Sequence, residues 1–323
     1  MSKTINWAII GLGSIAHKFA TDLLTIEDAQ IYAVGSRNQA KADKFANKYN
    51  AIKAYDSYET LVKDTNIDAV YIATPHALHK ENTLLCLEHG IPVLCEKPFA
   101  MNISQVNEMI TMAKEKNVLL MEALWTYFLP HYQFVLDIVK HKPYGNLIKL
   151  EADFGFYRAF DNTARLFNKD LGGGSLLDIG IYPIFAALST LGNPKDIIAN
   201  ASFFDNGADS SCHMTFIYDD SVTASLKSSL IQDTPTNATY YFEDATVKIN
   251  DYFHSPSTVS IIKDGKETVK DFNYTTIGYN YEAIHFGNLI RKGQTESDIM
   301  TFEFSQHLIT LLDKVRGLIN LHY

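Results

Sequence analysis

A glycine-rich turn near the N-terminus constrains the fold of this chain more than any other feature. The sequence GLGSIA occupies residues 11–16, directly after a short apolar run and directly before a helical pattern. This order recurs along the first third of the chain, with apolar runs at residues 5–10, 31–35, 69–73, 92–95 and 118–121. Strands that alternate with helices indicate a parallel sheet covered on both faces, whose ligands lie beyond the carboxyl ends of the strands. We therefore predict an α/β fold that begins with a doubly wound Rossmann domain.

The residue types within this turn suit a dinucleotide. Gly11 permits the tight turn, Gly13 lets the backbone approach a pyrophosphate, and Ala16 lets the helix pack closely on the sheet. Ser14 and Ile15 open the helix, where N–H groups and the positive end of the helix dipole attract phosphate. The alternative is a glycine-rich turn without a ligand, but its place between a strand and a helix favours the dinucleotide site.

The end of the second predicted strand separates NAD from NADP. NAD sites usually carry Asp or Glu there, bonded to the ribose 2′-OH, whereas this chain has Ser36 and Arg37. A guanidinium binds a 2′-phosphate through two hydrogen bonds, and Lys41 near the start of the next helix adds a second positive charge. The alternative is that both cations are solvated surface charges. The pattern favours NADP(H) over NAD(H) as the cofactor.

The pattern changes after residue 123, where we place a domain boundary. Residues 1–123 form the predicted dinucleotide-binding domain, and residues 124–323 form a predicted α+β domain for substrate binding and oligomerisation. Apart from an apolar helix at 176–191, this second part contains strand-like runs at 147–156, 197–204, 213–218, 222–230, 245–249, 258–263 and 267–272. Turn pairs such as Asn206-Gly207 and Asp264-Gly265 separate them, which is typical of hairpins. We predict a largely antiparallel open sheet, followed by helices at 281–292 and 302–319, the last of which can pack back on the first domain.

Composition excludes several classes of protein. Apolar residues make up 46% and charged residues 20% of the 323 residues, which is ordinary for a globular protein. A net charge of −9 argues against nucleic-acid binding, which needs a basic surface. The three cysteines form no CxxC pair, so they fit a reducing cytoplasm rather than a disulfide scaffold.

The first seven residues lack the features of a signal peptide, and the apolar stretch 179–192 is shorter than the ~20 residues of a membrane span. We expect a cytoplasmic protein with no membrane partner.

Lys97 is the first candidate for chemistry. It lies in the sequence EKP at residues 96–98, directly after the predicted strand 92–95 and therefore at the edge of the sheet where a doubly wound fold binds its ligands. A lysine there can hydrogen-bond a substrate hydroxyl, and desolvation lowers the pKa of its ammonium group. Taken alone, a surface lysine in the turn before Pro98 is the commoner interpretation.

The sequence GGGSLLDIGIYP at residues 172–183 provides the second candidate. Asp178 and Tyr182 are four residues apart, so they share one face of the predicted helix. A polar pair on so apolar a helix is expected to face a partner or a cleft, and the glycines would let the backbone come close to a cofactor. The alternative is a buried tyrosine with a satisfied hydroxyl and an aspartate near a helix start.

These motifs together resemble the GFO/IDH/MocA (glucose–fructose oxidoreductase / inositol dehydrogenase) family. The resemblance rests on GLGSIA, on Thr74 and Pro75 with His79, on EKP and on the segment ending at Tyr182, and it runs from the first strand to the last helix. It is strongest toward the dihydrodiol dehydrogenase and NADP-dependent D-xylose dehydrogenase branch. That branch has WTRF where this chain has Trp125-Thr126-Tyr127-Phe128, and the loss of the arginine puts the exact substrate in doubt.

The resemblance implies roles for named residues. Lys97 and Tyr182 would be the catalytic pair, with Asp178 orienting them, and the substrate pocket would be lined by Trp125, Phe154 and Tyr182. The implied cofactor contacts are Gly11, Gly13, Ser14, Ile15, Ala16, Ser36, Arg37, Lys41, Thr74, Pro75, His79, Glu96 and Trp125. His76 and His79 have a spacing seen in metal sites, but the family pattern needs no metal and none is expected.

The resemblance thus implies an NADP(H)-dependent oxidoreductase. A hydride would move between the nicotinamide and a carbinol carbon of a sugar, a sugar derivative or a dihydrodiol. The family also implies a homodimer or higher homo-oligomer, with the sheet of the second domain as a dimer face. The alternative is a non-enzymatic regulator that senses a dinucleotide on the same fold. The intact Lys97 and Tyr182 favour an enzyme.

Overall fold

The computed structural model describes residues 3–323 and divides into two compact units. The first unit extends to Trp125 and also contains Thr275–Gln306, whereas the second unit consists of Thr126–Tyr274 and His307–Tyr323. The segment Thr275–Gln306 was assigned to the second domain by sequence, so the chain returns to the first unit earlier than expected. Met1 and Ser2, at the start of the segment tested for a signal peptide, lie outside the described residues.

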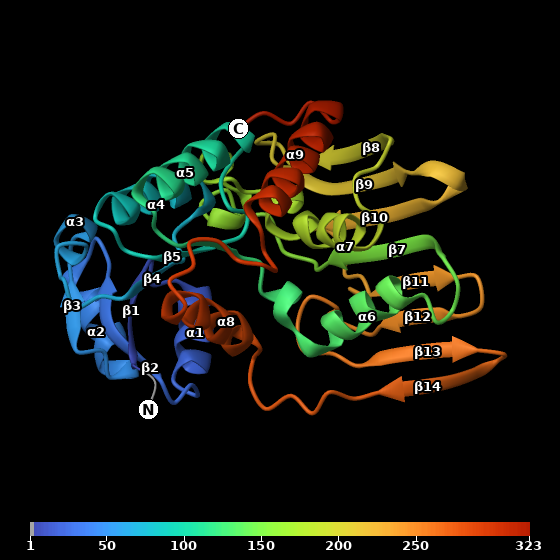
Figure 1. The fold of residues 1–323 in the computed structure, drawn as a ribbon. Helices are drawn as coiled ribbons and strands as arrows, with labels where there is room; N and C mark the ends of the chain where they lie inside the picture. The colour runs from blue at the N-terminus through green and yellow to red at the C-terminus, as the bar shows by residue number, and fades with distance from the viewer. Residues whose placement is uncertain (1–2) are drawn as a thin grey trace. The chain divides into compact units, whose positions relative to one another are not determined.

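The first unit contains a six-stranded parallel sheet in the order β3-β2-β1-β4-β5-β6, which confirms the doubly wound fold (Figure 1). Its strands are β1 (Ile5–Ile10), β2 (Ala29–Gly35), β3 (Lys53–Tyr55), β4 (Ala69–Ile72), β5 (Val93–Glu96) and β6 (Leu120–Ala123). Its helices are α1 (Ser14–Leu23), α2 (Gln39–Tyr49), α3 (Tyr58–Leu61), the short η1 (His76–Leu78), α4 (His79–Glu88), α5 (Ile103–Lys116) and α8 (Tyr279–Arg291). Because all strands are parallel, the turns that follow β1, β2, β4 and β5 lie along one edge of the sheet.

A buried aspartate ties the C-terminal segment into the first unit. The carboxylate of Asp22 on α1 is 1% exposed and accepts hydrogen bonds from the backbone N–H groups of Ile277 at 3.0 Å, Gly278 at 2.7 Å and Tyr279 at 2.8 Å. These are orphan donors at the start of α8, so Asp22 caps that helix from a distant part of the chain. Helix α8 therefore lies beside α1 (Figure 1), an arrangement that local sequence patterns do not contain.

The second unit contains an eight-stranded open sheet in the order β14-β13-β12-β11-β7-β10-β9-β8 (Figure 1). All neighbouring strands are antiparallel except β7 and β10, which confirms the largely antiparallel sheet. The strands are β7 (Leu147–Gly155), β8 (Asp196–Phe203), β9 (Asp209–Ile217), β10 (Thr223–Ser229), β11 (Ala238–Phe242), β12 (Thr246–Ile249), β13 (Val259–Lys263) and β14 (Lys266–Lys270). Strand β11 is absent from the predicted elements, although its burial alternates as a half-buried strand requires.

Helices α6 (Pro130–His141) and α7 (Ile181–Leu191) pack on one face of this sheet. The predicted helix 176–191 begins with a π-helical turn, Leu176–Gly180, which leads directly into α7. By length and composition alone, the segment Lys169–Leu191 is apolar enough to cross a membrane, so the apolar stretch is longer than the sequence prediction allowed. Burial within the protein covers 89% of its most apolar window, and this accounts for its hydrophobicity. Helix α9 (Phe302–Leu318) begins in the first unit and ends in the second.

Candidate functional site

The turn between β1 and α1 has the geometry of a phosphate cradle. Gly11 has φ +86°, and a Cβ there would lie 2.6 Å from the backbone of Ala73 and Thr74. At Gly13 a Cβ would meet nothing within 4 Å among the described residues. Helix α1 begins at Ser14 without a side-chain cap, so its first N–H groups are offered outward. The turn is therefore packed where it touches the sheet and open where a pyrophosphate would approach.

The turn after β2 presents cations. Ser36 is 7% exposed, and its N–H donates to the carbonyl of Tyr55 while its hydroxyl accepts from the N–H of Asn38. Asn38 caps α2 by accepting from the N–H of Lys41 at 3.0 Å. The side chains of Arg37 and Lys41 extend from this ordered turn into solvent. Two exposed cations on an ordered backbone suit an anionic group such as a 2′-phosphate.

His79 holds two turns together inside the unit. It is fully buried, with Nδ1 2.8 Å from the carbonyl of Pro98 and Nε2 2.9 Å from the carbonyl of Thr74. Its ring thus connects the turn after β4 to the turn after β5. In this position His79 supports the turn at Thr74 and Pro75, and its contact with the cofactor stays a prediction.

The EKP segment lies at the end of β5, next to two buried carboxyl groups, those of Glu96 and Glu122. Tyr71 donates to the carboxylate of Glu96, and the N–H of Phe99 donates to Glu122 Oε1 at 2.9 Å. Burial raises the pKa of the Glu122 carboxyl to about 7, against the lowering effect of the Phe99 hydrogen bond and the Lys97 charge. Lys97 is half-buried in the turn. Glu122 holds the backbone of the turn at Phe99, and Tyr71 anchors the side chain of Glu96, so Lys97 extends from a rigid support.

Trp125 is 5% exposed and stacks on Tyr279 of α8, with ring centroids 4.3 Å apart and planes 8° apart. Tyr279 donates its N–H to Asp22. The indole is therefore positioned by the same contact that caps α8. The sequence singled out Trp125 but contained no signal for Tyr279, which lies more than 150 residues away.

Tyr182 and Asp178 lie in the second unit. Tyr182 lies in the first turn of α7 and is 5% exposed, and Asp178 lies in the preceding π-helical turn. Arg165 Nη2 lies 3.1 Å from Asp178 Oδ1 in a partly exposed ion pair. π-helical turns often occur at functional sites because they change the direction of side chains. The partner of Asp178, Arg165, is not among the residues predicted from sequence.

The glycines before this helix serve the packing of the chain itself. A Cβ at Gly173 would lie 2.6 Å from the N atom of Asn168. A Cβ at Gly174, where φ is +126°, would collide with Oδ1 of Asp209. The other oxygen of Asp209 accepts from the hydroxyl of Ser175 and the N–H of Leu176, both at 2.7 Å. Burial raises the pKa of Asp209 to about 6. Internal packing therefore requires glycine at position 174, beside the carboxyl group that holds the helix start, and the approach of these glycines to a cofactor stays a prediction.

Three rings from separate elements meet around Tyr182. The ring centroids of Phe154 on β7 and Tyr182 lie 5.6 Å apart, so the structure brings together two residues predicted for the substrate pocket. His254 joins them from the loop between β12 and β13, 4.2 Å from Phe154 and 5.0 Å from Tyr182. Sequence analysis missed His254, because a single histidine in a loop carries no periodic or motif signal.

Tyr127 stands where the resemblance noted in the sequence would place an arginine. It is half-buried, and its ring packs edge-on against Phe185 of α7 at 5.1 Å. The replacement therefore substitutes an aromatic contact for a positive charge.

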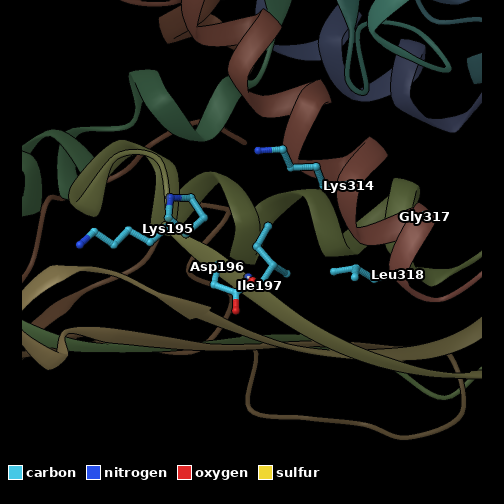
Figure 2. A pocket seen from close by; sticks show the side chains of 7 residues that line it. Lys195, Asp196, Ile197, Lys314, Gly317 and Leu318 are labelled. Atoms are coloured by element: carbon cyan, nitrogen blue, oxygen red, sulfur yellow. The ribbon is translucent and has the colours of Figure 1, made fainter.

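Two features remain, the pair of histidines in the first unit and a hollow in the second unit. The rings of His76 and His79 lie 5.7 Å apart, and within residues 3–323 no group of three or more His, Cys, Asp or Glu is arranged to hold a metal ion. A hollow between the start of β8 and the end of α9, lined by Ile197, Lys314 and Leu318 among others, contains none of the predicted site residues (Figure 2).

Family comparisons cover most of the chain. A family model described as an oxidoreductase family with an NAD-binding Rossmann fold matches residues 5–124, and one described as the GFO/IDH/MocA C-terminal domain matches residues 132–248.

Relatives that match over nearly their whole length support the same family. The chain is 35% identical to a trans-1,2-dihydrobenzene-1,2-diol dehydrogenase from Xenopus laevis over 320 residues, covering 95% of this chain and 96% of that protein. It is 36% identical to the NADP(+)-dependent scyllo-inositol 2-dehydrogenase of Bacillus subtilis over 327 residues, covering 99% and 98%. In fold it is similar to a 3-ketoreductase from Actinomadura kijaniata crystallised with NADP and TDP-benzene, with a TM-score of 0.89, 24% identity and 98% coverage of both chains.

Proposed function

The chain belongs to the GFO/IDH/MocA family of oxidoreductases, and we propose that it transfers a hydride between NADP(H) and a carbinol carbon. The proposed substrate is a sugar, a sugar derivative such as a polyol, or a dihydrodiol. The curated relatives named above act on a dihydrodiol and on an inositol, and the geometry of the first unit supports a dinucleotide cofactor.

One observation carries the proposal: the turns after β1, β2 and β5 end at one edge of a single parallel sheet. The open turn at Gly13 and the uncapped start of α1 suit the pyrophosphate. Arg37 and Lys41 suit a 2′-phosphate, and no carboxylate stands at the end of β2 to repel it. The Bacillus relative is named as an NADP(+)-dependent enzyme. These residues fit NADP(H) better than NAD(H).

In this proposal, the chemistry needs one hydride path and one proton path. When bound, the nicotinamide accepts or supplies the hydride. Tyr182 takes the hydroxyl proton from the carbinol during oxidation and returns it during reduction. A phenol has a reference pKa of about 10, and a nearby ammonium favours its ionised form. Lys97 supplies that charge and hydrogen-bonds the same substrate oxygen, and Asp178, paired with Arg165, orients this pair.

The experiment compares binding with turnover. Purified protein is titrated with NADP and NAD, and reduced-nicotinamide absorbance is followed with a panel of pentoses, hexoses, inositols and dihydrodiols. Turnover of one class with a preference for NADP supports the proposal. Cofactor binding without turnover on any substrate supports the alternative, a dinucleotide-sensing regulator on the same fold.

We also propose that the chain forms a homodimer or higher homo-oligomer in the cytoplasm. The sheet face opposite α6 and α7 carries half-exposed and exposed side chains, among them Ile198 and Ile262 at 54% and 40% exposure. The three cysteines, Cys86, Cys95 and Cys212, are buried free thiols, which suits a reducing compartment. Sedimentation measurements on the wild-type protein and on an Ile198→Lys variant test whether this face joins two copies.

A further inference from the structure

Three aromatic rings form a closed cluster in the second unit, which we call the ring cluster: Phe154, Tyr182 and His254. His254 stacks on Phe154 with planes 24° apart, and its ring meets that of Tyr182 at 49°. Phe154 and Tyr182 also contact each other. The three residues come from β7, α7 and the loop 250–258, so only the folded chain brings them together. Each ring is in contact with both others, and this limits the orientations available to the Tyr182 phenol.

The loop that carries His254 is anchored on both sides of the residue. The carbonyl of His254 accepts from the hydroxyl of Thr126 at 2.7 Å. The preceding residue, Phe253, is fully buried, and its N–H donates to the carbonyl of Thr236 at 2.9 Å. The backbone that positions the imidazole is therefore fixed by contacts with two other segments of the unit.

A buried histidine adds a third anchor. His131 on α6 is fully buried, and burial lowers its pKa to about 4, so its ring is neutral at physiological pH. A neutral ring donates from one nitrogen and accepts at the other. Nε2 lies 3.0 Å from the carbonyl of Phe253, and Nδ1 lies 2.6 Å from the hydroxyl of Tyr274. The carbonyl of Phe253 can only accept, so Nε2 is the donor there, and Nδ1 accepts from the hydroxyl of Tyr274, which also accepts from the backbone N–H of His131.

We propose that His254 is a positioning residue that orients the hydroxyl of Tyr182 for proton transfer through ring packing. This inference rests on the proposed function, in which Tyr182 exchanges the proton. The ring acts through its flat surface, because the contacts are stacked and tilted ring contacts held by an anchored loop. A side chain that keeps an aromatic ring at this position should preserve the effect, whereas a polar side chain without a ring should not.

Three variants of His254 distinguish the effect of an aromatic ring from the effect of the imidazole nitrogens. We expect His254→Ala to lower kcat by about tenfold, the scale of one or two aromatic contacts, with KM for NADP unchanged. His254→Gln should lose a similar amount, and His254→Phe should restore kcat to within about threefold of the wild type. His141→Ala at the end of α6 is the matched control, because this histidine is exposed and lies outside the ring cluster. Thermal melting of each variant separates lost turnover from lost folding.

The Tyr182→Phe background decides whether the effect acts through the phenol. Adding His254→Ala there should cost less than about twofold, since no hydroxyl remains to be oriented. A full tenfold loss in that background would overturn the inference, and so would a His254→Phe variant as poor as His254→Ala. Normal turnover in His254→Ala would also overturn it. Normal turnover in Tyr182→Phe alone would instead overturn the proposed function, so the two failures are distinguishable.

Discussion

The two units differ in how their functional residues are specified. In the first unit, most candidate residues lie in turns that follow strands of one parallel sheet, where short sequence motifs mark them, although Trp125 is held by Tyr279 of α8. In the second unit, Phe154, Tyr182 and His254 come from elements separated by dozens of residues and are held by side-chain contacts. Phosphate binding depends on backbone N–H groups and a short motif, whereas a substrate pocket depends on packing.

This difference predicts how the units respond to mutation. In the first unit, a change at Arg37 should alter cofactor choice alone, whereas a change at Lys97 should slow turnover because the lysine acts together with Tyr182. Changes in the second unit should alter proton transfer and depend on the residues around Tyr182. The following experiments test this division.

The largest effect is expected for Tyr182→Phe. The variant removes only the hydroxyl and keeps the ring that packs against Phe154 and His254. Substrate oxidation should fall by ~10²–10⁴-fold because the proton acceptor is lost, while thermal stability should stay close to that of the wild type. Steady-state kinetics over a range of pH measures this, and the basic limb of the profile should flatten or shift. Near-normal turnover with an unchanged profile would remove Tyr182 from the mechanism.

Lys97→Met should have the next largest effect. The substitution keeps the length of the side chain and removes its charge and its donors. Turnover should fall by ~10²-fold or more, while NADP binding measured by fluorescence titration should be retained. If turnover persists, the lysine of the EKP turn has only a structural role.

A stability measurement tests the buried acid beneath that turn. The pKa of Glu122 is raised from an ordinary value of 4.5 to about 7, so the folded protein keeps a proton that the unfolded chain loses across this interval. This bound proton adds about 3 kcal/mol to the free energy of unfolding. The contribution is fully present below pH 4.5 and is lost as the pH rises through 7. Glu122→Gln should remove this pH dependence. Both tryptophans, Trp7 and Trp125, lie in the first unit, so urea denaturation followed by tryptophan fluorescence reports on it.

The exposed Glu88→Gln variant of α4 serves as the control. It should show the same decline in stability between pH 4.5 and 7 as the wild type. An equal decline in the Glu122→Gln variant would mean that Glu122 ionises normally in the folded protein.

The smallest effect on catalysis is expected for Arg37→Asp, which concerns cofactor choice alone. Removing charge-assisted hydrogen bonds worth ~1.5–3 kcal/mol each should weaken NADP by roughly tenfold to a hundredfold and affect NAD far less. The ratio of kcat/KM for the two cofactors measures this. Equal losses for NADP and NAD would show that Arg37 does not contact the 2′-phosphate.

The extent of sequence prediction follows the same division between the units. Periodic apolar runs and the GLGSIA turn predicted the parallel sheet, because those signals are local. The strand β3 was missed because three residues are too few to show alternation. The placement of α8 depends on Asp22 capping a helix start more than 250 residues away. His254 and Arg165 became visible only through tertiary contacts.

The proposal that Lys97 and Tyr182 act as one catalytic unit, although they belong to different structural units, is tested by a double-mutant cycle. Turnover is measured for the wild type, Lys97→Met, Tyr182→Phe and the double variant under the same conditions. Residues that act together are non-additive, so the double variant should be only slightly slower than the slower single variant. A loss equal to the product of the two single losses would show that the two residues act independently and would contradict the proposed mechanism.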